Sequence, residues 1–104
     1  MGILVFCSYK AKPGREDEAR RLIGGHVPAL RRHDLVTGRE AVLAAGPEGV
    51  FVELFEWASE DASRSAPTIH EIGEHWKAMA EVMDFVPLAS LPQAQHPFAH
   101  FTPI

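Results

Sequence analysis

The sequence is short of several residue types that define large classes of protein site. Its single cysteine, Cys7, has no partner for an internal disulfide, and a thiolate zinc site needs more sulfur ligands. Lysine and arginine together number 10 against 14 acidic residues, and the resulting net charge of -4 argues against the basic surface that nucleic acids require. We therefore expect neither a disulfide framework nor a nucleic-acid partner.

Long apolar runs are also missing. The opening "MGILVFCSYKAKPG" has no basic residues before its apolar run, and that run is too short for a signal peptide. No stretch approaches the roughly 20 apolar residues that span a bilayer. The sequence predicts a cytoplasmic protein without membrane contact, and its 104 residues fit one domain with a real core.

What is present is an alternation of strand and helix patterns that predicts an α+β fold. The order is β-α-β-β-α-β, the ferredoxin-like arrangement of a four-stranded antiparallel sheet with helices on one face. Gly24, Gly25 and Pro28 predict a kink or break in the first helix. The expected elements are strands over 3–10, 36–46, 50–57 and 84–91, and helices over 15–34, briefly after Ser59, and over 69–83.

The predicted strands are apolar on both faces, which indicates a partner. In the strand over 50–57, Val50, Val52 and Leu54 alternate with Phe51, Phe55 and Trp57. Helices can cover one face only, so we expect a homodimer in which the two sheets pack face to face. The domain should span 1–92, and the proline-rich tail over 93–104 should be extended and packed on the domain or on the partner subunit.

The pattern of elements resembles the antibiotic biosynthesis monooxygenase (ABM) superfamily of dimeric α+β barrels. The matching segments are "FCSYKAKPGREDEARRLI", "VFVELFEWASEDASRSA" and "HEIGEHWKAMAEVMDFVPLASL", which together cover roughly residues 3–91. The resemblance implies a fold of this type, with a pocket for a small apolar or aromatic ligand.

Three activities follow from the resemblance. The first is cofactor-independent monooxygenation of a small aromatic or polyketide-like substrate, and the second is non-catalytic binding of an apolar ligand. The third is haem binding, because haem-degrading members combine an asparagine on the first strand with a strand-end tryptophan and a helix histidine. Trp57 occupies the matching strand end, and His70 or His75 lies on a suitable helix. Cys7 stands where those members have asparagine, which disfavours haem degradation.

The helix over 69–83 carries two histidines, but their spacing argues against a metal site. His70 and His75 are five residues apart, so a regular helix directs them to different sides, whereas a two-histidine site needs a spacing of three or four. The apolar stripe that ends at Met83 predicts core or interface packing, with His75 at its boundary. "TIHE" predicts a capping box between Thr68 and Glu71. His70 then lies in the first turn, either solvated or serving as a base at a pocket mouth.

Glu53 is the most unusual residue of the predicted sheet. Strand alternation places this acid on one face with Phe51, Phe55 and Trp57, so it is either paired or shifted in pKa. The hairpin register allows a diagonal contact with Arg39, and the alternative is an acid or base in a pocket.

Tyr9 completes the candidate set. Its hydroxyl either donates to a ligand oxygen or lies at the sheet edge. The sequence thus predicts a catalytic set of Glu53, Trp57, Tyr9 and the two histidines His70 and His75, without metal or cofactor.

Overall fold

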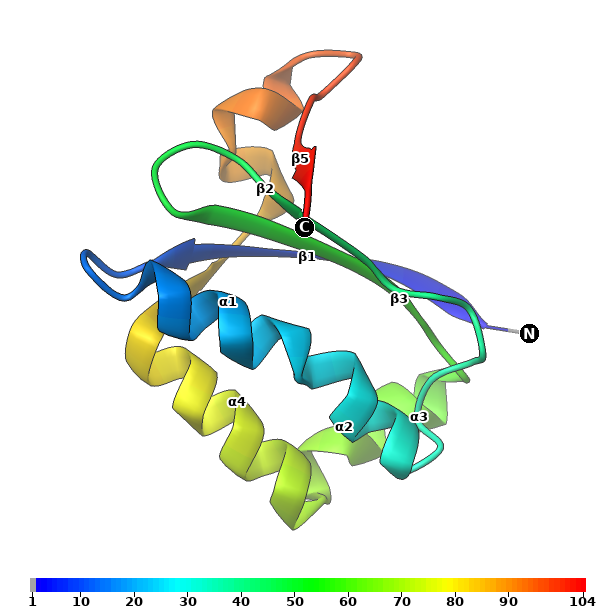
Figure 1. Ribbon diagram of the computed structural model, residues 1–104. Helices are drawn as coiled ribbons and strands as arrows, with labels where there is room; N and C mark the ends of the chain where they lie inside the picture. The colour runs from blue at the N-terminus through cyan, green and yellow to red at the C-terminus, as the bar shows by residue number, and fades with distance from the viewer. Residues whose placement is uncertain (1) are drawn as a thin grey trace.

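An antiparallel sheet forms one layer of the protein, and helices cover one of its faces (Figure 1). The computed structural model describes residues 2–104. Neighbouring strands follow the order β4-β1-β3-β2-β5. The strands are β1 (Ile3–Ala11), β2 (Val42–Ala45), β3 (Val50–Trp57), β4 (Met83–Val86) and β5 (Thr102–Pro103).

The paired strands β1 and β3 form the centre of the sheet. Cys7 lies opposite Glu53 and Tyr9 opposite Phe51, so the odd-numbered residues of both strands face the helices. On the other side of β3, Leu43 of β2 lies opposite Glu53, as the hairpin predicts. Glu53 therefore sits in the middle of the sheet, on its covered face.

The sheet has five strands where the sequence predicted four. β5, from the C-terminal tail, pairs with β2 through Ala44 and Ala45. Strand β4 ends at Val86, and the residues after Pro87 form a short 3-10 turn rather than continuing the strand to residue 91. A second such turn spans Pro92–Gln95, so the tail is only partly extended.

The helical layer consists of α1 (Glu16–Gly24), α2 (His26–Arg32), α3 (Glu60–Ser65) and α4 (His70–Val82). Gly25 separates α1 from α2, which confirms the predicted break. The acidic first turn of α1 and the basic last turn of α2 match the electrostatic preference of helix ends. Ser59 caps α3, because its side chain accepts the amide hydrogen of Ala62.

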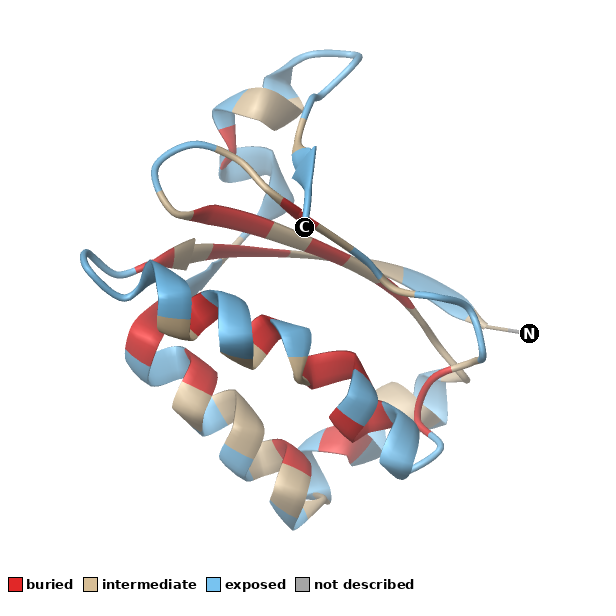
Figure 2. Cartoon of the chain, viewed as in Figure 1, coloured by how far each residue is buried: buried red, intermediate tan, exposed pale blue. Residues whose placement is uncertain are grey.

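The core lies between the sheet and the helices, where the inward faces of both layers are buried (Figure 2). The predicted apolar stripe belongs to it: Ile72 and Met79 of α4 are fully buried, as is Met83 at the start of β4, and Trp76 is half-buried. Burying a side chain of this size contributes about 1.5–3 kcal/mol. The stripe is therefore packing surface, as the sequence predicts.

The predicted capping box before α4 is wrong. Ala66–Thr68 forms a 3-10 turn, in which the Thr68 hydroxyl donates to the carbonyl of Ser65. The Glu71 carboxylate instead bonds to Arg32 and His33 at the end of α2. A charged contact between helices has replaced the local cap.

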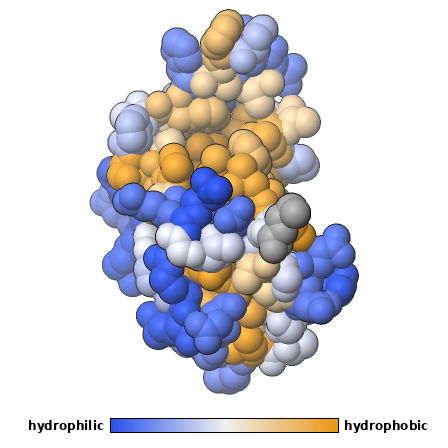
Figure 3. Space-filling model, turned by 90° about the vertical axis from the view of Figure 1, so that its right-hand side faces the viewer, coloured by the Kyte–Doolittle hydropathy of each residue, from blue (hydrophilic) through white to orange (hydrophobic). Residues whose placement is uncertain are grey.

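The face of the sheet opposite the helices remains strongly apolar. Leu4, Phe6 and Val42 are 48%, 53% and 56% exposed on this outer face. Figure 3 shows hydrophobic side chains gathered on the half of the surface that carries the C-terminal segment. Among residues 2–104, no helix combines the length and apolar character needed to cross a bilayer.

Candidate active site

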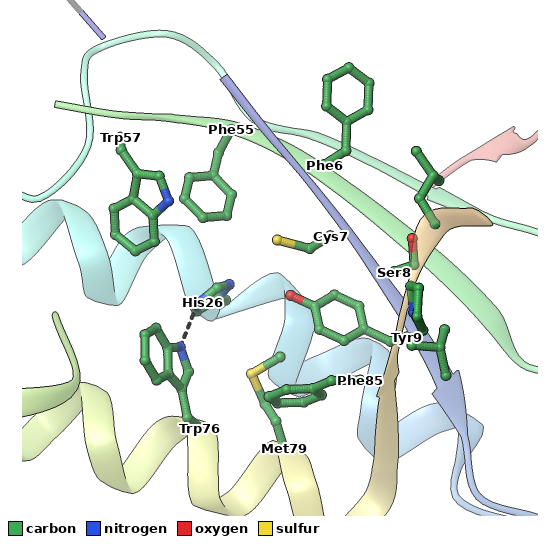
Figure 4. A pocket seen from close by; sticks show the side chains of 13 residues that line it. Phe6, Cys7, Ser8, Tyr9, His26, Phe55, Trp57, Trp76, Met79 and Phe85 are labelled. Carbon is green, nitrogen blue, oxygen red and sulfur yellow. Dashed lines mark hydrogen bonds between the residues drawn. The ribbon is translucent and has the colours of Figure 1, made fainter. Parts of the chain in front are cut away.

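A cavity of about 420 Å³ lies between β1, β3 and the helices (Figure 4). Its volume is within the range of small-molecule sites, and its walls are mostly aromatic or aliphatic. Polar atoms come from a small number of side chains on β1, α2, β3 and α4. The lining consists of Phe6, Cys7, Ser8, Tyr9, His26, Phe55, Trp57, Trp76, Met79, Phe85, Val86, Pro87 and Leu88.

Glu53 lies behind the wall of the cavity and holds two of the lining residues. Its side chain is 0% exposed. Its Oε1 accepts a hydrogen bond from the Tyr9 hydroxyl at 2.7 Å and lies 2.8 Å from Nδ1 of His26. Its Oε2 is buried and has no hydrogen-bond partner among residues 2–104. A carboxylate so enclosed depends on these two donors for its stabilisation.

His26 is fixed on both ring nitrogens. The indole Nε1–H of Trp76 donates to its Nε2 at 2.7 Å. Because an indole nitrogen can only donate, Nε2 carries the lone pair and Nδ1 carries the hydrogen that is donated to Glu53. The imidazole is therefore neutral, and its basic nitrogen points toward Trp76 at the cavity wall (Figure 4).

The break between α1 and α2 places His26 at the site. His26 is the first residue of α2 and is 4% exposed. At Gly25 an added Cβ would lie 3.4 Å from Cε1 of His75, so a glycine leaves room for that ring. His75 in turn stacks on His26, with ring centroids 5.9 Å apart. Gly25 thus leaves room for a second imidazole to lie against His26.

Aromatic rings extend the wall on either side of the imidazole. Phe55 meets His26 edge-on, with centroids 5.6 Å apart, and Trp57 meets Phe55 in the same way at 5.0 Å. Tyr9 makes an edge contact with Phe85 at 5.4 Å. These edge-to-face contacts hold the rings in fixed orientations. The cavity therefore presents flat apolar surfaces, which suit a planar ligand.

Burial and the charge of Glu53 keep the neighbouring donors protonated. Burial is the larger cause, and the negative charge of Glu53 the second, that raises the pKa of Tyr9 far above its ordinary value. The same two causes raise the pKa of Cys7 to about 11. Tyr9 is thus a hydroxyl and Cys7 a thiol at neutral pH, and neither serves as an anionic nucleophile.

The structure brings three of the five predicted site residues together. Tyr9 and Glu53 share a hydrogen bond, and Trp57 lines the same cavity. The Tyr9 hydroxyl lies neither at the sheet edge nor free for a ligand, since it donates to Glu53. The predicted contact between Arg39 and Glu53 is wrong, because Arg39 bonds instead to Glu56, with Nε 3.3 Å from Oε1.

The two helix histidines lie apart from one another. His75 is half-buried, and its Nε2 donates to the carbonyl of Leu22 at 2.8 Å. His70 is exposed at the start of α4. The structure therefore supports the prediction that they do not act as a pair, and it places His75 nearer to the cavity than His70.

Sequence reasoning missed His26 and assigned Trp76 only to packing. A signal for His26 was available, because it follows Ile23 by three residues and precedes Leu30 by four, which places it on the buried stripe of the helix. A histidine at such a position needs polar partners. Those partners come from β3 and α4, which local spacing does not connect.

The residues do not fit the haem site that the family resemblance implies. Cys7 replaces the first-strand asparagine, Nε2 of His75 is bonded to a carbonyl, and His70 is exposed. Among residues 2–104, no group of three or more His, Cys, Asp or Glu side chains is arranged to hold a metal ion.

Comparison with known proteins gives a structural likeness alone. No protein-family model matches the sequence, and no curated protein matches it. The fold is similar to that of SnoaB, a cofactor-independent oxygenase from Streptomyces nogalater, with a TM-score of 0.64 and 16% sequence identity. The match covers 80% of this chain and 85% of that one. At this identity the likeness shows a shared fold and nothing more.

Proposed function

We propose that this protein is a cofactor-independent monooxygenase that acts on a small aromatic or polyketide-like phenol. The observation that carries the proposal is the apolar cavity with one buried network, Glu53–His26–Trp76, on its wall. Cofactor-free oxygenation needs a base that turns an electron-rich substrate into its anion in a cavity that excludes water. The likeness to SnoaB supports the same class of activity.

The expected reaction is balanced without a cofactor. The substrate loses a proton, its anion reduces O₂, and the two combine to form a hydroperoxide at a ring carbon. Loss of water from that hydroperoxide leaves a carbonyl group. One O₂ is consumed and one water released for each carbonyl formed, and the substrate supplies all the electrons.

An anthrone is a suitable test substrate, because its enol tautomer is a tricyclic phenol and its oxidation product is an anthraquinone. We expect O₂ uptake and anthraquinone absorbance in equal amounts, above the rate in buffer, with a metal chelator present. The variant His33→Gln is a matched control, because it alters an exposed histidine that also bonds to a glutamate. A rate equal to that in buffer would refute oxygenation of this substrate class.

The same substrate distinguishes catalysis from the non-catalytic alternative, in which the protein only binds an apolar ligand. Trp57 and Trp76 line the cavity, so a bound aromatic ligand should quench tryptophan fluorescence. Quenching by anthrone without O₂ uptake would favour an apolar-ligand binder. Haem binding is tested by adding haemin to the protein; a Soret shift would favour it, and we expect none.

We also propose that a second copy of this chain covers the outer face of the sheet. Leu4, Phe6 and Val42 are largely exposed there, and the tail leaves beside them an apolar groove of about 530 Å³. Phe6 and Leu88 line both this groove and the cavity, so a partner on this face would lie beside the mouth of the site. Light scattering should show a dimer for the wild type and a monomer for Phe6→Glu; a wild-type monomer at micromolar concentration would refute the proposal.

A further inference from the structure

We propose that His26 is the catalytic base that takes the hydroxyl proton of the substrate, and that the Trp76 indole N–H occupies the position of that hydroxyl in the free protein. The inference rests on the proposed function for its substrate class. The inference goes beyond that function by assigning the proton transfer to one nitrogen atom, Nε2 of His26.

The hydrogen bonds of His26 prepare its Nε2 to accept a proton. Nδ1–H donates to Glu53 at 2.8 Å, which fixes the tautomer and leaves the lone pair on Nε2. When the substrate O–H bond breaks, its proton forms a new bond to Nε2 and the electron pair remains on the oxygen. The resulting imidazolium lies against a carboxylate that is already buried. Glu53 is thus the positioning residue of this base, because it both orients and stabilises the charged ring.

Trp76 marks where the substrate oxygen binds. In the free protein its N–H lies 2.7 Å from Nε2, which leaves no space for another atom between them. A protonated Nε2 and an indole N–H are both donors, so they cannot remain bonded to each other. The indole must therefore turn aside when the substrate binds. Because Trp76 is half-buried at the cavity wall, its side chain has an open side toward which to move.

After that movement both donors can serve the anionic oxygen. The imidazolium Nε2–H and the indole Nε1–H would then bond to the same oxygen atom, stabilising the charge that develops there. The hydroperoxide loses water when the proton on its ring carbon leaves together with hydroxide. Its own O–H proton comes from His26, which protonates the peroxide anion that forms when O₂ adds to the substrate anion. The base is thereby returned to its neutral form.

The charges around His26 select the kind of substrate. The titratable groups that face it are Glu53 from β3 and His75 from α4, and Tyr9 and Cys7 from β1 lie next to Glu53. None of the described lining residues is a lysine or arginine. A carboxylate substrate would meet the charge of Glu53 without a cation to offset it. A neutral phenol or enol keeps the net charge of the site constant, so this class is expected.

Anaerobic binding of 2-naphthol tests the base directly. This bicyclic phenol is neutral in water at pH 7, and its anion absorbs at longer wavelengths than tryptophan does. We expect the ratio of naphtholate to naphthol in the wild-type complex to exceed that in water by about tenfold or more, equivalent to one pKa unit. In His26→Gln the ratio should return to that in water, and in Glu53→Gln it should fall. In Trp76→Phe, Nε2 of His26 is free but the indole donor to the anion is lost, so the ratio should stay above that in water and fall below that of the wild type. The control His33→Gln should keep the wild-type ratio.

A measurement on the wild type keeps the proposal testable if a variant fails to fold. In protein labelled with ¹⁵N at histidine, Nε2 of His26 should give the signal of a lone-pair nitrogen when free and of a protonated nitrogen when naphthol is bound. A wild-type complex that contains only neutral naphthol, or unchanged ionisation in folded His26→Gln, would overturn the assignment.

The two proposals fail separately. If naphthol is ionised through His26 but anthrone is not oxidised, the base is established and oxygenation is refuted. If anthrone is oxidised while His26→Gln retains full naphthol ionisation, the function stands and the assignment of the base is refuted.

Discussion

Removing the Tyr9 hydroxyl should weaken the fold more than removing a similar hydroxyl at the surface. In Tyr9→Phe the ring stays in contact with Phe85, and Glu53 loses one of its two hydrogen-bond donors. Hydrogen bonds to charged groups contribute about 1.5–3 kcal/mol, and the cost of leaving a buried acceptor with fewer partners lies within that range. We therefore expect a loss of about 2 kcal/mol in the free energy of unfolding. The melting temperature of a domain of this size should then fall by about 8–16 °C.

Thr37→Val provides a matched comparison. The Thr37 hydroxyl also donates to a glutamate, Glu56, at the same distance of 2.7 Å, but this carboxylate is partly exposed. Water can replace the lost donor there, so the loss in the free energy of unfolding should be smaller than that of Tyr9→Phe. Both variants are compared by urea unfolding at one protein concentration. If Tyr9→Phe loses no more free energy than Thr37→Val, then Glu53 does not depend on its buried donors, and the electrostatic account of the site is wrong.

Two further predictions concern groups outside the base itself. A hydrogen bond from Arg32 is the larger cause, and one from His33 the second, that lowers the pKa of Glu71 to about 2. The ionised Glu71 therefore stabilises the fold fully above its ordinary pKa of about 4.5, and this stabilisation is lost as the pH falls toward 2. The melting temperature of the wild type should therefore fall more steeply between pH 4.5 and 2 than that of Glu71→Gln; equal slopes in circular dichroism would contradict this. Burial, and then the charge of Glu53, raises the pKa of Cys7 from its ordinary value of 9.0 to about 11. Its alkylation by iodoacetamide at pH 8 should therefore be on the order of a hundredfold slower than that of free cysteine. Mass spectrometry measures this rate, and labelling at the rate of free cysteine would show that the thiol is not shielded.

The sequence was informative wherever local periodicity determines structure. Alternation in the strand over 50–57 placed Glu53 on the aromatic face, and the hairpin placed Leu43 opposite it. The paired glycines correctly predicted the break in the first helix. These features depend on neighbours within a few residues, which a sequence displays directly.

The partners of Glu53 could not be found in the same way. Register arithmetic suggested Arg39, because it considers only residues of the same hairpin. The actual partners, Tyr9 and His26, lie 44 and 27 residues away, on another strand and on the helical layer. Which helix residue lies above a given strand residue depends on the packing of the two layers. Packing of α2 against α4 within the helical layer likewise placed Glu71 at Arg32, away from its predicted cap.

The hydrogen-bond network makes the site a property of the whole chain. Tyr9, His26, Glu53 and Trp76 come from β1, α2, β3 and α4, so no single hairpin or helix pair contains the binding geometry. A ligand held there binds the native state alone, and its binding free energy adds to the cost of global unfolding. Amides in β1 and β3 that exchange hydrogen only on global unfolding should therefore all gain the same additional protection when the ligand binds. Ligand binding would thus report the cooperativity of the entire domain.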